Sequence, residues 1–201
     1  MSSQEKSYER LNQKRRTRTE LLRSARELAS QGMTPSVAEV ADHAGISKAT
    51  AYRYFSAQDE MLREALLDGV AGLIHIEPAR DGLSHEQLWL RLEDVVRQIF
   101  VMVRDNEAMF RALLSSSMSA TSEQPRGARR VVWLETALAP LRKELGKHEF
   151  DHLLHALSLA TGIETLVVMK DIWRLDDESA EQSVLWTAKT LYEGAIARLK
   201  H

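Results

Sequence analysis

Apolar residues recur along most of the chain at the three-to-four-residue spacing of amphipathic helices, and no segment alternates cleanly as a half-buried strand would. The first such stripe consists of Leu21, Leu22, Ala25, Leu28 and Ala29. It predicts a helix from about Gln13 to Gly32. Residues 1–12 are polar and lack this spacing, so we expect them to be disordered. The pattern as a whole predicts an all-α protein.

The same spacing predicts further helices at about 57–73, 84–103, 106–114, 128–145, 149–173 and 178–200. Pro140 should kink the helix that contains it, because proline removes a helical N–H and clashes with the preceding turn. The last two helices are long and only a short connection separates them, so they should be antiparallel neighbours. Their apolar residues spread beyond one narrow stripe. We therefore predict a homodimer in which helices 149–173 and 178–200 pair with their twofold mates.

Residues 36–55 have the layout of two short helices joined by a tight turn. Ser36 and Glu39 have the spacing of a capping box at the start of the first helix. Gly45 stands at the turn, where glycine tolerates a positive φ, and Ser47 can cap the second helix. This is the helix-turn-helix arrangement, whose second helix enters the DNA major groove. The alternative is an ordinary helical hairpin, but the outer face of the second helix carries hydrogen-bond donors and a cation.

The segment 17–67 resembles the N-terminal domain of the tetracycline-repressor (TetR) family of transcriptional regulators. The matching pieces are Leu21-Leu22-x-x-Ala25-x-x-Leu28-Ala29-x-x-Gly32, Val37-Ala38-Glu39-Val40-Ala41-x-x-Ala44-Gly45-Ile46-Ser47, Thr50-Ala51-Tyr52-Arg53-Tyr54-Phe55 and Asp59-Glu60-Met61-Leu62. The resemblance implies a dimeric repressor that a small molecule releases from its operator. The segment differs from the family at Gln58, where a phosphate-contacting lysine is usual. It also differs at Ala51, where a bulkier aliphatic residue often stands.

The residues expected to face double-stranded DNA are Ser36, Ser47, Lys48, Ala49, Thr50, Tyr52 and Arg53. The family resemblance places a phosphate-contacting tyrosine at Tyr52, and a half-buried aromatic is the alternative. Lys48 and Thr50 are placed for phosphate or base contacts. Arg53 could read a guanine or pair with a carboxylate.

The charge of the chain is uneven along its length. The 201 residues carry a net charge of −2, yet residues 1–55 hold ten Lys or Arg against six Asp or Glu, a balance of +4. The rest is acidic, so only the front of the chain is expected to meet nucleic acid. Basic residues gather at Lys14, Arg15, Arg16 and Arg18, where they could follow the DNA backbone or simply be solvated.

Composition adds a few exclusions. There is no cysteine, which excludes disulfides and Cys-based zinc sites and suits a reducing compartment. No apolar run reaches the roughly 18 residues needed to span a membrane, and the polar start is no signal peptide. We therefore expect a cytoplasmic protein without a membrane partner. No Gly-rich phosphate loop or Gly-x-Ser-x-Gly elbow supports catalysis, so an enzyme is not expected.

The larger C-terminal part is expected to bind a small organic effector in an apolar cavity. The candidate lining residues are Phe110, Trp133, His152, His155 and Glu164. Glu164 stands in an otherwise apolar helix, where a pocket, an interface or a plain surface position could explain it. The histidines could also suggest a metal, but zinc needs three or four ligands, so we expect no metal and no cofactor.

The sequence therefore predicts a helix-turn-helix domain over 1–56 and a helical effector-binding and dimerisation domain over 57–201. Two alternatives stay open. One is a DNA-binding or co-regulator protein with no small-molecule effector, and the other is a helical enzyme with an accessory DNA-binding head.

Overall fold

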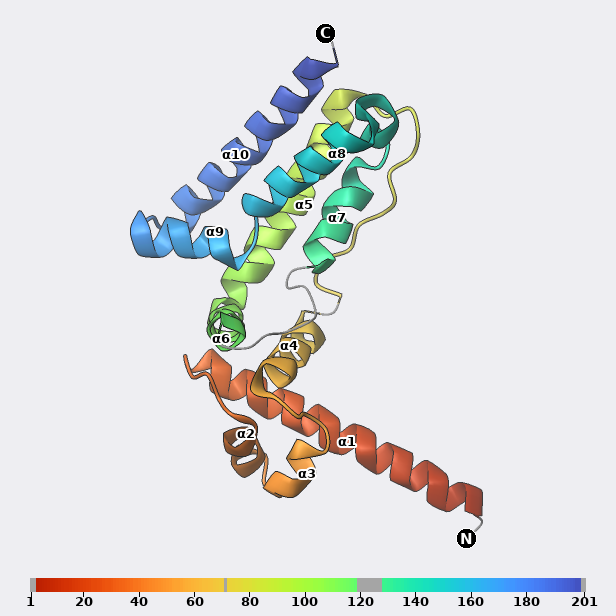
Figure 1. The fold of residues 1–201 in the computed structure, drawn as a ribbon, viewed down its shortest axis with the longest axis vertical. Helices are drawn as coiled ribbons and strands as arrows, with labels where there is room; N and C mark the ends of the chain where they lie inside the picture. Colours follow the sequence, from red (N-terminus) through yellow and green to blue (C-terminus); the bar gives the residue numbers. More distant parts are fainter. Residues whose placement is uncertain (1–2, 71, 119–127, 200–201) are drawn as a thin grey trace. The chain divides into compact units, whose positions relative to one another are not determined.

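The computed structural model describes residues 3–70, 72–118 and 128–199, which contain ten α-helices, one π-helical turn and no strand. The helices are labelled in Figure 1. Their bounds are α1 Ser3–Ser30, α2 Val37–His43, α3 Lys48–Tyr52, α4 Gln58–Gly69, α5 His85–Asp105, α6 Glu107–Met118, α7 Ala128–Leu138, α8 Leu141–Leu159, α9 Ile163–Val167 and α10 Asp177–Arg198, with the π-helical turn η1 at Val168–Ile172. The all-α prediction is confirmed.

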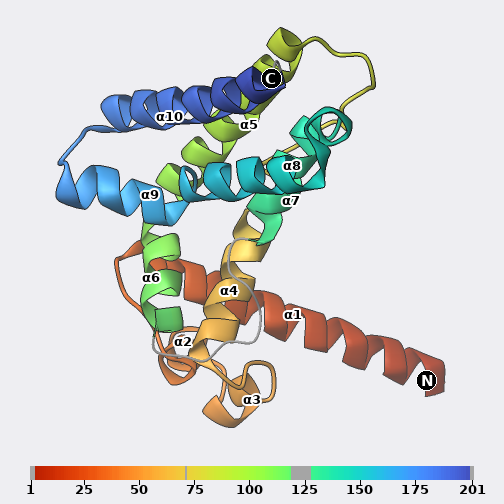
Figure 2. The same cartoon turned by 45° about the horizontal axis from the view of Figure 1, so that its top comes forward.

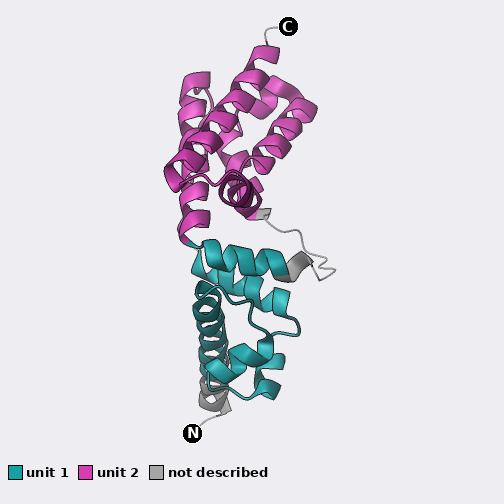
Figure 3. Ribbon diagram, turned by 90° about the vertical axis from the view of Figure 1, so that its left-hand side faces the viewer, with its two compact units in different colours: residues 1–71, 106–123 teal, residues 72–105, 124–201 magenta. Residues whose placement is uncertain are grey.

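The chain forms two compact units, coloured separately in Figure 3. The first contains residues 1–71 and 106–123, and the second contains residues 72–105 and 124–201. This division differs from the predicted boundary after residue 56, because α4 and α6 pack with α1. The assignment of effector binding and dimerisation to residues 57–201 concerns function and remains a prediction.

The first unit is built on the apolar stripe of α1. Its buried residues are Leu21, Leu22, Ala25, Leu28 and Ala29, the set that the sequence predicted. The helix α4 packs against α1 and buries Met61, Leu62, Ala65 and Leu66. Each large side chain removed from water in this way stabilises the fold by roughly 1.5–3 kcal/mol. This core supports α2 and α3, because α2 packs against α1 and α3 packs against α2.

The second unit is organised around α5, which packs against α7 and α10, while α8 packs against α7 and α10. The buried face of α5 follows the predicted stripe: Leu88, Leu92, Val95, Val96, Ile99, Phe100, Met102 and Val103. At its beginning, the backbone carbonyl of His85 accepts a hydrogen bond of 2.7 Å from the Tyr192 hydroxyl of α10. Burial, and then the nearby Glu144 carboxylate, raise the pKa of Tyr192 to about 12. The hydroxyl therefore stays protonated and keeps donating.

Two helices differ from their predicted bounds. The helix α1 begins at Ser3, so the expectation of disorder over residues 1–12 is wrong for residues 3–12. Gln, Glu, Lys, Arg and Leu dominate this stretch, and their helix propensity is high although they form no apolar stripe. Pro140 also acts differently from the expected kink, since it precedes the first residue of α8 and separates that helix from α7.

The predicted helix over 149–173 is broken. Figure 2 shows α9 turning away from the end of α8 and leading on to α10. The break lies at Gly162, whose φ of 99° is a conformation that favours glycine, and α8 with the α9–η1 segment encloses a bend of 45°. After it, α9 runs into the π-helical turn η1. The predicted last helix is confirmed as α10.

Among the described residues, no single helix is long and apolar enough to cross a membrane. The bent pair formed by Leu141–Leu159 and Ile163–Ile172 meets the length and composition test only when its two parts are taken together.

Candidate DNA-binding surface

The turn between α2 and α3 is held by local hydrogen bonds that the sequence specifies. The Ser36 N–H donates to the Glu39 carboxylate at 2.7 Å, and the Glu39 N–H donates back to the Ser36 hydroxyl at 3.2 Å. These bonds complete the predicted capping box and lower the pKa of Glu39, the backbone bond from Ser36 being the largest cause. At the other end of α2, Gly45 has a φ of 65°, and the Ile46 N–H donates to the Ala41 carbonyl at 2.9 Å. The chain can therefore reverse into α3 within a few residues.

The Ser47 hydroxyl begins α3 as the sequence predicted. It accepts a hydrogen bond of 3.2 Å from the Thr50 N–H and donates one of 2.9 Å to the Thr50 hydroxyl. Ala51 and Phe55 are fully buried, so they fix the inner side of this segment in the core of the first unit. Ala51 is the position where the family often has a bulkier residue. Here its small side chain lets α3 lie close to its neighbours.

The opposite side of α3 is exposed and polar. Tyr52 is 51% exposed, and Lys48, Ala49 and Arg53 are also exposed. About half of Tyr52 is therefore open to solvent, and its contact with a phosphate stays a prediction. One side of α3 is buried and the other carries hydroxyl, ammonium and guanidinium groups. The exposed side can therefore bind in a DNA groove while the buried side keeps its packing.

The exposed cations of this surface have different surroundings. The Lys48 ammonium lies 3.1 Å from the Asp42 carboxylate, and both side chains are largely exposed, so the pair contributes at most about 1 kcal/mol. Arg53 forms no ion pair with any described residue. A phosphate could therefore engage Arg53 directly, whereas Lys48 would first have to leave Asp42. Ser36 is half-buried and its hydroxyl donates to Glu39 at 2.7 Å, so its first role is that of a helix cap.

Two further residues, Arg18 and Gln58, make contacts within the first unit that the sequence did not predict. Arg18 belongs to the basic cluster of α1, but its guanidinium pairs with Glu64 of α4 and lies 5.8 Å from the centre of the Phe55 ring. It therefore ties α1 to α4. Gln58, at the usual position of a phosphate-contacting lysine, donates instead to the backbone carbonyl of Thr34 at 2.7 Å.

The five predicted effector-binding residues do not gather around one hollow. Phe110 belongs to the first compact unit, and the other four belong to the second. His152 and His155 are exposed on α8, Trp133 is half-buried on α7, and Glu164 pairs with Arg130 at 2.9 Å. None of the five lines either of two hollows in the described part of the chain. One hollow, of about 10 Å³, lies between α5, the segment around Gly162 and α10. The other has a volume of about 480 Å³, and its lining residues fall between residues 77 and 91.

The fold and this surface define an all-helical protein with a helix-turn-helix DNA-binding module. Residues 21–65 match the sequence model of the family described as bacterial regulatory proteins, tetR family. The crystal structure of a TetR transcriptional regulator from Rhodococcus sp. RHA1 has a similar fold, with a TM-score of 0.62 and 19% identity over 88% of this chain and 95% of that one. No curated protein matches the chain. Residues 21–65 therefore form a TetR-type DNA-binding domain, and most of the chain shares the fold of a TetR transcriptional regulator.

Proposed function

We propose that the protein is a cytoplasmic repressor that binds a palindromic operator as a homodimer and leaves it when a small organic ligand binds. The observation that carries the DNA-binding part is the two-sided character of α3. Its inner side is anchored by the buried residues Ala51 and Phe55, and its outer side presents Lys48, Tyr52 and Arg53 to solvent. We propose that Tyr52 and Arg53 contact the operator first, since neither is held by an ion pair with a described residue.

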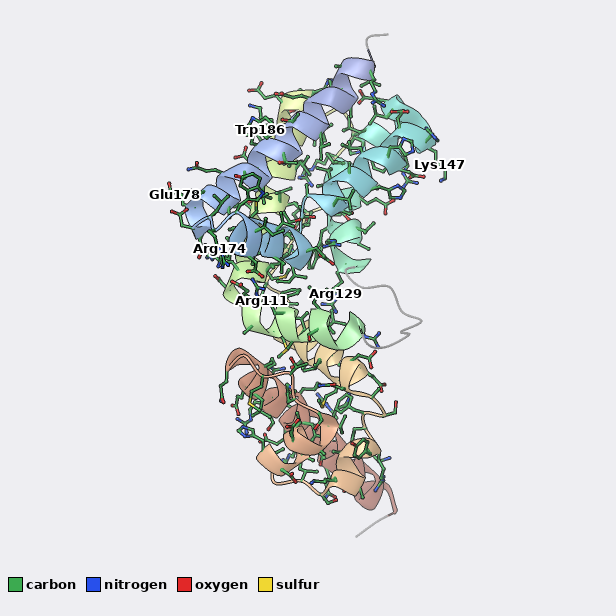
Figure 4. The ribbon with its side chains drawn as sticks, turned by 60° about the vertical axis from the view of Figure 1, so that its left-hand side comes forward. Arg111, Arg129, Lys147, Arg174, Glu178 and Trp186 are labelled. Carbon is green, nitrogen blue, oxygen red and sulfur yellow. The ribbon has the colours of Figure 1, made fainter. Side chains whose placement is uncertain are left out.

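The dimer is supported by apolar side chains that the second unit leaves exposed. Leu159 of α8 is 82% exposed and Trp186 of α10 is 70% exposed. Both lie opposite the buried side of their own helix, which is formed by Leu153 and Leu157 in α8 and by Val184 and Ala188 in α10. Trp186 is labelled in Figure 4. A twofold mate that covers these two residues would remove a large apolar surface from water.

Two recognition helices related by such an axis could meet successive major grooves, roughly 34–36 Å apart on one face of DNA. A single module buries only about 600–1,000 Å² on DNA, which is little for tight and specific binding. The dimer and the palindrome are therefore parts of one proposal.

We propose that the effector binds among the helices of the second unit, next to the hollow between α5, Gly162 and α10. That hollow, of about 10 Å³, holds about one water molecule, so an organic ligand would have to enlarge it. It is lined mainly by apolar residues, including Phe100, Leu166 and Val184. The broken segment at Gly162 forms one wall. We propose that a ligand enlarges this hollow by displacing α9, and that it binds the DNA-releasing arrangement more tightly than the DNA-bound one.

The DNA-binding part is tested by fluorescence anisotropy with the full chain, a labelled operator duplex and an unrelated duplex. Tyr52→Phe should weaken binding to both duplexes, because a phosphate contact positions without specifying. Arg53→Ala should reduce the ratio between the two affinities if Arg53 reads a base. Leu90→Ala, an exposed change on α5 away from the proposed dimer surface, is the control. If α3 substitutions leave both affinities unchanged, the proposal fails.

A further inference from the structure

One cluster of metal-binding side chains lies outside the DNA-binding surface. Residues 148–152 read His-Glu-Phe-Asp-His, which has the His-Glu-x-x-His spacing of helical zinc-binding motifs. They lie on α8, just after an irregular backbone position at Gly146. Because positions four apart share one face of a helix, the spacing brings two imidazoles together on the outer side of α8.

The structure places the three side chains within reach of a single ion. The ring centres of His148 and His152 are 4.2 Å apart. One candidate ligand atom from each of His148, Glu149 and His152 lies within 4.8 Å of the other two. The His148 Nδ1 and a Glu149 carboxylate oxygen are 3.4 Å apart. His148 is exposed, with 79% of its side chain accessible, so small rotations can close these distances to those of a metal site.

We propose that His148 and His152 chelate a divalent transition-metal ion, with the Glu149 carboxylate as a third ligand. Imidazole nitrogen and carboxylate oxygen are the donors that suit Zn²⁺, Ni²⁺ and Cu²⁺, whereas Mg²⁺ and Ca²⁺ prefer sites made of oxygen alone. Water completes the coordination, since the site is open to solvent. This site is independent of the proposed function, and no residue of the DNA-binding surface belongs to it.

The third ligand, Glu149, already pairs with a cation that would compete with the metal ion. The Arg198 guanidinium of α10 lies 2.7 Å from the second carboxylate oxygen of Glu149. A metal ion at the cluster therefore shares Glu149 with Arg198 or displaces it. Removal of the guanidinium should leave the carboxylate to the metal alone.

His155 provides a matched control on the same helix. It is exposed and lies three residues beyond His152, yet it is not part of the cluster of ligand atoms within 4.8 Å. A site that simply needs any two exposed histidines on α8 would lose affinity on substitution of His155. The proposed site would not.

The experiment is isothermal titration calorimetry of the full chain with Zn²⁺ in a weakly chelating buffer. His148→Ala and His152→Ala should each weaken Zn²⁺ binding by about tenfold or more, while His155→Ala leaves it within about twofold. Arg198→Ala should tighten binding, and circular dichroism shows that every variant keeps its helix content. In two-dimensional NMR, Zn²⁺ should shift the imidazole signals of His148 and His152 before that of His155.

Several results would overturn the proposal. Wild-type protein that takes up no Zn²⁺ in the titration would do so, since the three ligand atoms that lie within 4.8 Å of one another would then hold no ion. Equal losses in the His155→Ala and His148→Ala variants would show that the metal sits elsewhere on α8. Unchanged affinity in Glu149→Ala would remove Glu149 from the ligand set.

Discussion

Gly162→Ala should destabilise the second unit, because the glycine is held in a strained turn against a charged side chain. A Cβ added at this position would lie 1.9 Å from Nη1 of Arg130, and it would also lie 3.1 Å from a carboxylate oxygen of Glu164. Nη1 of Arg130 in turn donates to the Thr161 carbonyl at 2.8 Å and to Glu164 at 2.9 Å. The substitution must therefore move Arg130 and break these bonds.

The cost can be assembled from these contacts. The backbone of Gly162, with φ 99° and ψ −173°, lies in a region that is essentially restricted to glycine, and a residue with a Cβ there costs on the order of 1–3 kcal/mol. Loss of the hydrogen bond from the guanidinium to the Thr161 carbonyl costs about 1.5–3 kcal/mol. The pair with Glu164 adds little, because the Glu164 side chain is 47% exposed and water screens it. We expect a loss of about 3 kcal/mol, which lowers Tm by roughly 6–12 °C for a chain of this length.

The assay is thermal and urea unfolding followed by circular dichroism. Gly194→Ala is the matched control, because Gly194 lies within α10 and nothing stands within 4 Å of an added Cβ. That change should be neutral or stabilise the protein by up to about 1 kcal/mol. In the double variant Gly162→Ala with Arg130→Ala, the two losses should not add, because the clash is already gone. If Gly162→Ala is as stable as Gly194→Ala, the described role of this turn is refuted.

Three further predictions concern the DNA-binding surface and the dimer. Gln58→Lys should tighten binding to all DNA sequences and steepen the dependence of log K on log salt by about 0.9 per subunit, measured by anisotropy across salt concentrations; an unchanged slope contradicts it. Leu159→Glu should shift the protein to a monomer in light scattering, whereas Leu90→Glu, equally an exposed leucine but on α5, should not. The lowered pKa of Glu39 means that its stabilising bond with Ser36 is present above the ordinary glutamate pKa and is lost as pH falls through the lowered value. Glu39→Gln should remove that part of the acid dependence of the urea midpoint, and identical pH profiles would show that the cap contributes nothing.

The helix-turn-helix could be predicted because its determinants are local. The capping pair Ser36 and Glu39, the turn at Gly45 and the cap at Ser47 each act within a few residues, and the structure shows all of them. The break at Gly162 was missed for the opposite reason. The apolar spacing continues through it, and only the neighbouring Arg130, far away in sequence, shows what the glycine accommodates.

Contacts between helices that are far apart in the sequence could not be predicted, because they depend on tertiary packing. Nothing local indicates that Arg18 pairs with Glu64 instead of facing solvent, or that α6 packs with α1 and α4. The predicted effector residues followed from residue type and from position along a single helix, and neither determines which side chains from different helices surround one hollow. His148 was a missed local signal, because its spacing from His152 is visible in the sequence.

Selection of bound sequences from a random pool of DNA duplexes by the full-length protein tests the central claim most directly. The account predicts enrichment of one palindromic or near-palindromic site, with half-sites about one helical turn apart, and loss of that enrichment when Tyr52→Phe and Arg53→Ala are combined. Enrichment of no sequence, or of the same sequence by the double variant, would contradict it.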